Sequence, residues 1–298
     1  MFKDIDALSE VISIIICVSS RSVGGMIDSN IRETIGADYE LVVIDNSNSA
    51  YNIFTAYSEG TKKAKGNILV FIHEDVTFRS ESWGKILEQN FLDESVGVIG
   101  VAGTHFLPKH PCAWWDSGIS SMHYLQGTNT GGEYITRYNN EDVFKRSSNE
   151  MASLDGFFLA FPKRIFDIIQ WDTSLFDGFH GYDTDICLQV LHSGHKVCMN
   201  WDILLEHKSL GNVTSSAFQD SQGAVFRKWE GFLPVERGIV LSDTEKSLCS
   251  ELAVNQYYIR SLQIKMGSLE YKLGRAMLHP FSFLKRKFDR IIDFFDKR

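Results

Sequence analysis

Carboxylates and an imidazole follow apolar segments of this sequence at points where they could bind a metal ion or contact a ligand. His73, Glu74 and Asp75 come directly after the apolar run at 68–72. A carboxylate at the end of a buried strand can hold Mg²⁺ or Mn²⁺ against phosphate oxygens. The other interpretation is an acidic turn in contact with solvent. The residues therefore leave open a metal site and a simple strand-end turn.

Two further carboxylates stand at the ends of apolar segments. Asp183 precedes a helical pattern, where a carboxylate can accept a proton from a hydroxyl or favour the N-terminus of the helix. Asp185, two residues on, is expected to cap that helix or to hold an arginine. Asp45 follows the apolar run at 41–44. Its acceptor-only carboxylate suits hydroxyl or imide donors, although an Asx turn has the same composition.

The elements that position these residues alternate in type along the first hundred residues. Apolar, β-branched runs predict buried strands, and fourfold or threefold spacing of apolar residues predicts helices between them. The strands are expected at 11–18, 41–44, 68–72 and 96–101, and the helices at 27–35, 51–65 and 83–91. This alternation is typical of βαβ units with a parallel sheet. Ligands bind at the carboxyl edge of such sheets, where 45–49 and 73–75 fall.

The second half of the chain is less regular. Between residues 104 and 149 the periodicity fades, and polar, aromatic and glycine residues dominate, including Trp114 and Trp115. A long segment without pattern is usually a functional loop. Strands at 154–161 and 196–199 and helices at 164–169 and 184–191 follow. We expect loops at 104–150 and 210–235 to select the substrates.

Composition excludes several classes of protein. The chain has 298 residues, of which 44% are hydrophobic and 23% charged, so a disordered or collagen-like chain is excluded. The net charge of −8 is a poor match for nucleic acid. The five cysteines form no CxxC pair, which predicts free thiols in a reducing compartment. The longest apolar run has the length of a strand, not of a membrane span.

Six motifs in order resemble the large family-two-like group of nucleotide-sugar glycosyltransferases, which have the GT-A fold. They are SIIICVSSR (13–21), ELVVIDNSNS (40–49), AKGNILVFIHEDV (64–76), LDGFFLAFPKRIF (154–166), FHGYDTDICLQVLHSGHKV (179–197) and EH (206–207). The resemblance implies an α/β, mostly parallel, Rossmann-like sheet with helices on both faces. It also implies a nucleotide-diphosphate-sugar donor, a divalent cofactor (Mn or Mg) and an inverting transfer to a glycan or lipid-linked hydroxyl.

The resemblance assigns roles to individual residues. Asp75 and His207 would be metal ligands and Asp183 the catalytic base, although a lone histidine is also commonly structural. Donor-binding residues would be Ser19, Arg21, Asp45, His73, Glu74, Asp155 and Gly156. Acceptor-binding residues would be Trp114, Trp115, His180 and Tyr182; paired tryptophans also commonly supply packing area.

Three positions depart from the family pattern. His73 stands at the first position of the Asp-x-Asp-type triplet, Tyr182 replaces the glutamate before the catalytic base, and Cys17 replaces a proline. The departures at His73 and Tyr182 keep open a catalytically inactive sugar-binding or scaffold protein of the same fold. A sugar-phosphate nucleotidyltransferase is the less favoured alternative, because Ser19–Gly25 lacks a Gly-rich triphosphate loop.

The sequence predicts a glycosyltransferase domain at 1–238, with a nucleotide-binding half at about 11–103 and an acceptor-side half at about 104–238. A helical region at 239–298 follows. Within 241–273, apolar residues and Asn255 keep a 3.5-residue spacing, which predicts a homo-oligomeric coiled coil. The alternative is a long amphipathic helix packed on its own domain. The repeat consists of Leu248, Leu252, Asn255, Ile259, Leu262, Met266, Leu269 and Leu273.

The last segment, 281–298, alternates aromatic and basic residues on an amphipathic pattern. Such a segment suits the surface of an anionic membrane. We therefore expect a cytoplasmic protein with peripheral contact to the inner face of the cell membrane. This setting suits bacterial enzymes that build surface polysaccharides or lipid-linked glycans.

Overall fold

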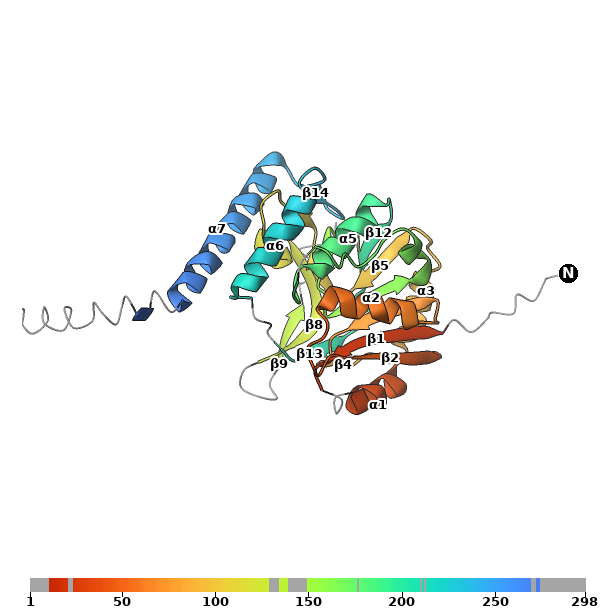
Figure 1. Ribbon diagram of the computed structural model, residues 1–298. Coiled ribbons are helices and arrows are strands. Elements are labelled where there is room, and N and C mark those ends of the chain that lie inside the picture. Colours follow the sequence, from red (N-terminus) through yellow and green to blue (C-terminus); the bar gives the residue numbers. More distant parts are fainter. Residues whose placement is uncertain are drawn as a thin grey trace, which may run out of the picture.

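The computed structural model describes residues 11–20, 24–128, 134–138, 149–175, 177–209, 211, 213–268 and 272–273. Figure 1 shows helices on both sides of a central sheet and a long helix, α7, beside α6. The predictions made for Arg21, Leu269 and 281–298 fall outside the described residues. Among the described residues, no helix is both long enough and apolar enough to cross a membrane.

The central sheet contains the four strands predicted in the first hundred residues together with β11 and β12, in the order β12-β5-β11-β3-β1-β2. The strand predicted at 196–199 is confirmed, whereas the one predicted at 154–161 is divided between β11 and a short strand of a second sheet. Its strands are β1 (Ile12–Val18), β2 (Tyr39–Asp45), β3 (Ile68–Ile72), β5 (Val96–Gly100), β11 (Phe158–Pro162) and β12 (Lys196–Met199). β1 runs parallel to β2 and β3, whereas β11 lies antiparallel between β3 and β5. The mostly parallel sheet is therefore confirmed. The sequence did not reveal the insertion of β11, because a strand buried on both faces has the same pattern in either direction.

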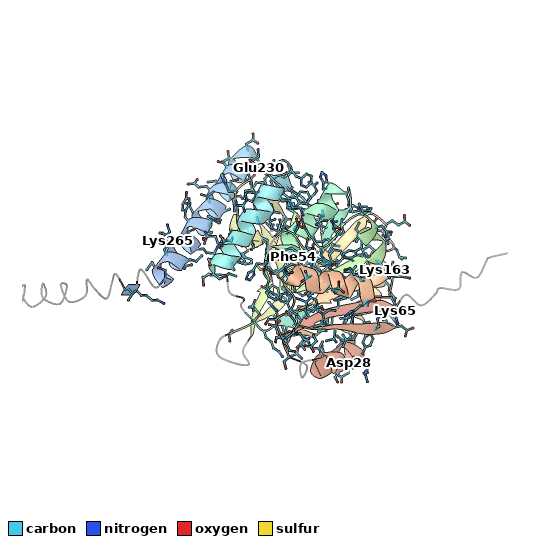
Figure 2. All side chains as sticks on the ribbon, in the orientation of Figure 1. Asp28, Phe54, Lys65, Lys163, Glu230 and Lys265 are labelled. Carbon is cyan, nitrogen blue, oxygen red and sulfur yellow. The ribbon has the colours of Figure 1, made fainter. Side chains whose placement is uncertain are left out.

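Helices cover both faces of this sheet, and successive residues of β1 point into different cores. Ile15 packs with residues of α2 (Ile53–Lys63) and α5 (Tyr182–His192). Ile14 and Ile16 pack with residues of α1 (Gly24–Thr34) and α3 (Trp83–Asn90). Figure 2 shows Phe54 of α2 in the interior and labelled charged side chains at the periphery. The result is a sheet buried on both faces, whose carboxyl edge carries the polar residues after β1, β2 and β3.

A second sheet occupies much of the region expected to lack regular structure, so that expectation was wrong. Its strands follow the order β10-β6-β8-β13-β4, and β9 (Tyr134–Tyr138) pairs with β8. They are β4 (Val76–Phe78), β6 (Ala102–Thr104), β8 (Ser120–Gly127), β10 (Ser153–Leu154) and β13 (Leu205–His207). β8 lacks a clear apolar alternation because it buries polar side chains such as Ser121 and Gln126. A strand that buries polar side chains lacks the alternation of apolar residues from which a strand is predicted, so β8 was missed.

Short elements complete the half of the domain that was predicted to bind the acceptor. The 3₁₀ turns η1 (Trp114–Ser117) and η2 (Lys163–Asp167) follow β7 (Phe106–Leu107) and β11. β7 pairs with β14 (Val235–Glu236). Helix α6 (Ser216–Lys228) occupies half of the predicted loop at 210–235, which corrects that expectation. Its apolar residues Phe218, Val225 and Phe226 are buried, and their helical spacing was the available signal.

Helix α7 (Asp243–Gly267) starts with a capping box formed by Ser242 and Glu245. It packs on η1 and α6 through a stripe that contains Cys249, Ala253 and Arg260. The predicted coiled-coil stripe lies beside this one and is exposed at Leu248, Leu252, Ile259, Leu262, Met266 and Leu273. The helix therefore packs on its own domain through one stripe, and pairing through the other stays a prediction.

All five cysteines are free thiols, as predicted. Cys112, Cys187 and Cys249 are buried, whereas Cys17 and Cys198 are partly buried. Burial raises the pKa of the Cys17 thiol to about 11, and the nearby Glu74 adds to this rise. These thiols are therefore protonated at neutral pH and contribute packing.

Candidate active site

A cavity of about 910 Å³ opens at the carboxyl edge of the central sheet, beside the N-terminus of α5. It contains many of the residues singled out in the sequence, from both the donor and the acceptor groups. Among its lining residues are Ser19, His73, Glu74, Asp75, Trp114, Trp115, Asp155, His180, Tyr182, Asp183 and His207. The fold thus gathers side chains that are up to 188 positions apart (from 19 to 207) around one space.

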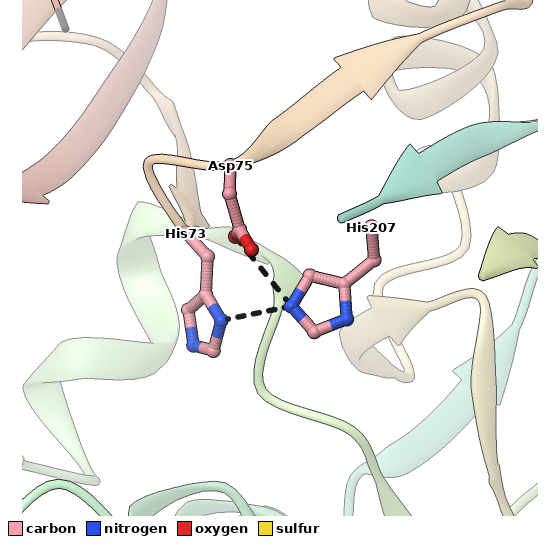
Figure 3. Close-up of side chains that lie close together, drawn as sticks. All are labelled: His73, Asp75 and His207. Atoms are coloured by element: carbon pink, nitrogen blue, oxygen red, sulfur yellow. Dashed lines mark hydrogen bonds and ion pairs between the residues drawn. The ribbon is translucent and has the colours of Figure 1, made fainter. Parts of the chain in front are cut away.

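His73, Asp75 and His207 form a cluster with the donor set of a metal site. One ligand atom from each residue lies within 4.8 Å of those of the others. Figure 3 shows the three side chains converging, with Nδ1 of His73 3.4 Å and Oδ1 of Asp75 3.5 Å from Nε2 of His207. Pairing of β13 with β4 places His207 opposite Val76, directly after the 73–75 turn. The sequence analysis predicted Asp75 and His207 as metal ligands but assigned His73 to donor binding.

The protonation states of this cluster suit a divalent cation. Burial, reinforced by neighbouring His207, lowers the pKa of His73 to about 4, so its imidazole is neutral at pH 7. Burial alone would raise the pKa of Asp75, but His207 and hydrogen bonds from Ser209 outweigh it and lower this pKa. A neutral imidazole and an ionised carboxylate are the ligand forms that Mn²⁺ or Mg²⁺ requires. The residues therefore fit the metal that the resemblance implies.

The two most prominent departures from the family pattern contact each other. Nε2 of His73 lies 2.7 Å from the hydroxyl of Tyr182. Burial raises the pKa of Tyr182 far above its usual value, so the phenol stays neutral. Its hydroxyl oxygen can then accept a hydrogen bond from Nε2–H of His73. Nδ1 of His73 then carries a lone pair on the side of Asp75 and His207, as expected of an oriented metal ligand. The two departures therefore form one hydrogen-bonded pair beside the cavity.

Gly156 makes room for this tyrosine. A Cβ atom at position 156 would lie 2.2 Å from the Tyr182 hydroxyl oxygen, so a side chain here would displace the phenol. The resemblance assigned Gly156 to donor binding, where glycine would allow the backbone to approach a ligand closely. The structure gives a second reason for glycine, which is the space needed by Tyr182.

Asp183 occupies the first turn of α5, and its Oδ1 accepts a hydrogen bond of 2.8 Å from the backbone N–H of Thr184. Burial, with the charge of Asp155 as the next cause, raises the pKa of Asp183 to about 7. The indole Nε1 of Trp114 donates to Oδ2 of Asp155 at 3.0 Å and so fixes this neighbouring carboxylate. A carboxylate with a pKa near neutrality has the properties of a general base.

Asp185 has a structural role that differs from the prediction of a helix cap or an arginine partner. It is buried and accepts hydrogen bonds from the indole Nε1 of Trp229 at 2.7 Å and from Nε2 of Gln189 at 2.8 Å. Lys228 lies 2.8 Å from its Oδ1. The cation is therefore a lysine from α6, and Asp185 joins α5 to α6 away from the cavity lining.

The remaining donor-side residues divide into two groups. Glu74 accepts hydrogen bonds from the backbone N–H and the hydroxyl of Ser19, so the loops after β1 and β3 are joined at the cavity. Asp45 is absent from the lining residues, and its Oδ1 accepts from the backbone N–H of Ser47 at 3.0 Å, as in an Asx turn. Asn46 and Ser49 line the cavity beside it. Nothing in the sequence distinguished these two neighbours.

The residues predicted to bind the acceptor, apart from Tyr182, belong to an aromatic wall. Trp114 is buried, whereas Trp115 is 36% exposed and stacks on Phe218 of α6. His180 meets the same phenylalanine edge-on, at 5.1 Å between ring centroids. The sequence missed Phe218 and Gln222, which line the cavity from α6. The helical spacing of α6 could have been recognised, but its approach to the cavity could not.

Comparison with known proteins identifies the family of the chain. The model of the glycosyltransferase-like family matches residues 13–220. The chain belongs to this family. It is a glycosyltransferase, and the match covers well over half of its length. A comparison with curated protein sequences gives no match.

Two solved structures share the fold of this glycosyltransferase at low sequence identity. A mannosyltransferase from Pyrobaculum calidifontis, in complex with GDP-Man and Mn²⁺, has a TM-score of 0.51 and 12% identity over 91% of this chain and 80% of its own. GalNAc-T7 with UDP, GalNAc and Mn²⁺ has a TM-score of 0.50 and 12% identity over 90% of this chain. This chain spans only 58% of GalNAc-T7. The likeness confirms the GT-A fold.

Proposed function

We propose that this glycosyltransferase moves a sugar from a nucleotide-diphosphate donor to a hydroxyl of a glycan or lipid-linked acceptor, with inversion and with a divalent metal. The observation that carries the proposal is the position of the His73–Asp75–His207 cluster and of Asp183 on one cavity. One group could hold the leaving nucleotide and the other could activate the incoming hydroxyl. The inverting outcome rests on the family resemblance.

His73, Asp75 and His207 would hold the metal. When bound there, Mn²⁺ or Mg²⁺ supplies positive charge that stabilises the departing diphosphate. Two observations support this role: the donor set suits such an ion, and both similar structures contain Mn²⁺ together with a nucleotide or nucleotide sugar. Tyr182 would orient His73, and the joined loops of Ser19 and Glu74 would contact the donor.

Asp183 would accept the proton of the acceptor hydroxyl as its oxygen forms the new bond to the anomeric carbon. Its pKa of about 7 leaves about half of the groups ionised at neutral pH. Proton transfer to such a base contributes about 10²–10⁴ in rate. Asp155 would lie under the donor sugar and, through its charge, set the basicity of Asp183.

The proposal is tested by measuring thermal stability with UDP- and GDP-sugars, with and without Mn²⁺. Binding at a hundredfold excess over Kd should add about 2.7 kcal/mol to the free energy of unfolding. Mn²⁺-dependent release of the nucleoside diphosphate, lost in EDTA, is the second measurement. The absence of both effects for every nucleotide sugar would contradict the proposal.

The variant Asp75→Asn tests the metal site itself. We expect turnover to fall by at least about 100-fold, because the amide cannot stabilise the cation at the leaving group. The exposed Asp220 of α6 provides the matched control, since Asp220→Asn removes the same charge at a side chain that does not line the cavity. Full activity of Asp75→Asn in the presence of Mn²⁺ would exclude Asp75 as a ligand.

A further inference from the structure

One wall of the cavity consists of aromatic side chains from distant parts of the chain. Trp115 of η1 and Phe218 of α6 stack with 19° between their planes and 6.2 Å between their centroids. His180 packs edge-on against Phe218, and all three residues line the cavity. Because Trp115 is 36% exposed, part of its indole remains available to a ligand.

Gln222 brings an unsatisfied polar group to the same wall. It lies one helical turn after Phe218 on α6, is only 4% exposed and lines the cavity. Its Oε1 is buried and has no hydrogen-bond partner among the described residues. Buried polar atoms are almost always hydrogen-bonded, so such an atom at a cavity indicates a ligand group that completes it.

The wall is supported from outside the cavity by α7. Arg260 is buried, its guanidinium lies 5.8 Å from the centre of the Phe218 ring, and it pairs with Asp116 of η1. Nη1 of Arg260 donates to Oδ1 of Asp116 at 2.8 Å. The guanidinium of Arg260 therefore contacts both η1, through Asp116 next to Trp115, and α6, through Phe218. These contacts hold the Trp115 and Phe218 rings together.

The chemistry of this wall selects among possible acceptors. Among the described residues that line the cavity, none is a lysine or an arginine, so the wall offers no Lys or Arg cation to pair with a phosphate or carboxylate. A hydrocarbon chain would leave the Gln222 amide oxygen unsatisfied. A sugar ring meets both demands, because its C–H face packs on an indole and its hydroxyls bind an amide.

We propose that Trp115, Phe218 and Gln222 form a subsite for a neutral sugar ring of the acceptor, with the Gln222 side-chain amide bound to one of its hydroxyls. This inference rests on the proposed function, because it names the acceptor for the same cavity. It makes Gln222 a specificity-determining residue contributed by α6. Arg260 is a positioning residue that acts through Asp116 and Phe218.

The test compares transfer with hydrolysis, using a nucleotide sugar that stabilises the protein. Nucleoside diphosphate release is measured with water alone, with methyl glycosides of neutral sugars (glucose, galactose, mannose and N-acetylglucosamine), and with 1-butanol. We expect at least one glycoside to raise the release and to form a glycosidic product, and 1-butanol to have no effect. Gln222→Leu should then lower the ratio of transfer to hydrolysis at least tenfold.

Two matched variants complete the design. Gln263→Leu changes an exposed glutamine of α7 and should leave transfer and hydrolysis unchanged. Trp115→Leu should raise the KM for the glycoside more than it lowers kcat, because it removes a binding face. Stabilisation by the donor shows that each variant is folded.

Three outcomes would overturn the subsite while the proposed function stands. They are donor hydrolysis that no glycoside raises, equal stimulation by 1-butanol, and a transfer ratio that Gln222→Leu leaves unchanged. Failure of every nucleotide sugar to bind would instead overturn the proposed function, and the subsite with it.

Discussion

The proposed donor side and the proposed acceptor side of the cavity are built in different ways. On the donor side, His73, Asp75 and His207 stand at strand ends and interact with one another. On the acceptor side, Trp115 and Phe218 come from a 3₁₀ turn and a helix and meet through ring faces. Under the proposed function, the sheet would therefore fix the groups for the donor, whereas a 3₁₀ turn and a helix outside the sheet would shape the space for the acceptor.

Asp183 lies where the two sides meet, and its replacement should have the largest effect. Asp183→Asn should lower the transfer rate by about 10²–10⁴, because an amide cannot accept the proton. Stabilisation by donor and Mn²⁺ should persist, since the donor side is intact. The measurements are kcat and the donor-induced shift in Tm, with Asp220→Asn as control.

The reverse result for Asp183→Asn would be equally informative. If donor affinity collapses while turnover at saturation stays normal, Asp183 is a helix-terminal carboxylate and not the base. Asp185 would be a poor substitute, because Lys228 and Trp229 already occupy its carboxylate.

Arg260 tests whether α7 belongs to the acceptor side. Arg260→Met leaves the buried Asp116 without its cation, so we expect stability to fall by about 3 kcal/mol. The KM for the acceptor should rise about tenfold as the wall loosens, whereas donor-induced stabilisation should change little. Urea unfolding and steady-state kinetics measure the two effects.

Two further variants distinguish the effect of Arg260 on the acceptor KM from its effect on stability. The double variant Arg260→Met with Asp116→Asn should regain part of the lost stability, because no buried charge remains unpaired. Arg227→Met removes an exposed arginine of α6 and should change neither quantity. An acceptor KM that is the same in wild type and Arg260→Met would show that α7 does not support acceptor binding through Arg260.

The pH dependence of kcat/KM tests whether Asp155 influences Asp183, and the expected effect is moderate. Because the proposed base Asp183 would act in its ionised form and its pKa is about 7, kcat/KM should rise with pH through about 7 and level off above it. The negative charge of Asp155 raises this pKa, so Asp155→Asn should move the rise to lower pH. A rise that stays at the same pH in Asp155→Asn would mean that another group controls it.

The smallest effect on catalysis is expected from the exposed stripe of α7. If chains pair through 241–273, Leu262→Glu combined with Ile259→Glu should convert an oligomer into a monomer in sedimentation, since both side chains are exposed in the single chain. Turnover should stay within about twofold, because the packed stripe with Arg260 is unchanged. A wild-type chain that sediments as a monomer would contradict the predicted coiled coil.

The sequence by itself determined the central strands and the residues at their ends. Runs such as 11–18 and 68–72 are continuous and β-branched, and a local pattern of this kind is enough to predict a buried strand. The polar residues that follow, His73 and Asp75 among them, lie at the carboxyl edge because strands between helices run parallel. The ordered motifs then gave the family, which the comparison confirmed.

Only the tertiary structure decided which side chains meet. His73 and His207 are 134 positions apart, and His73 and Tyr182 are 109 positions apart, so no local pattern links them. The antiparallel β11, the approach of Gln222 to the cavity and the pairing of Arg260 with Asp116 likewise depend on how distant elements pack. A sequence pattern records which face of an element is apolar, whereas the partner of that face is chosen by the free energy of the whole fold.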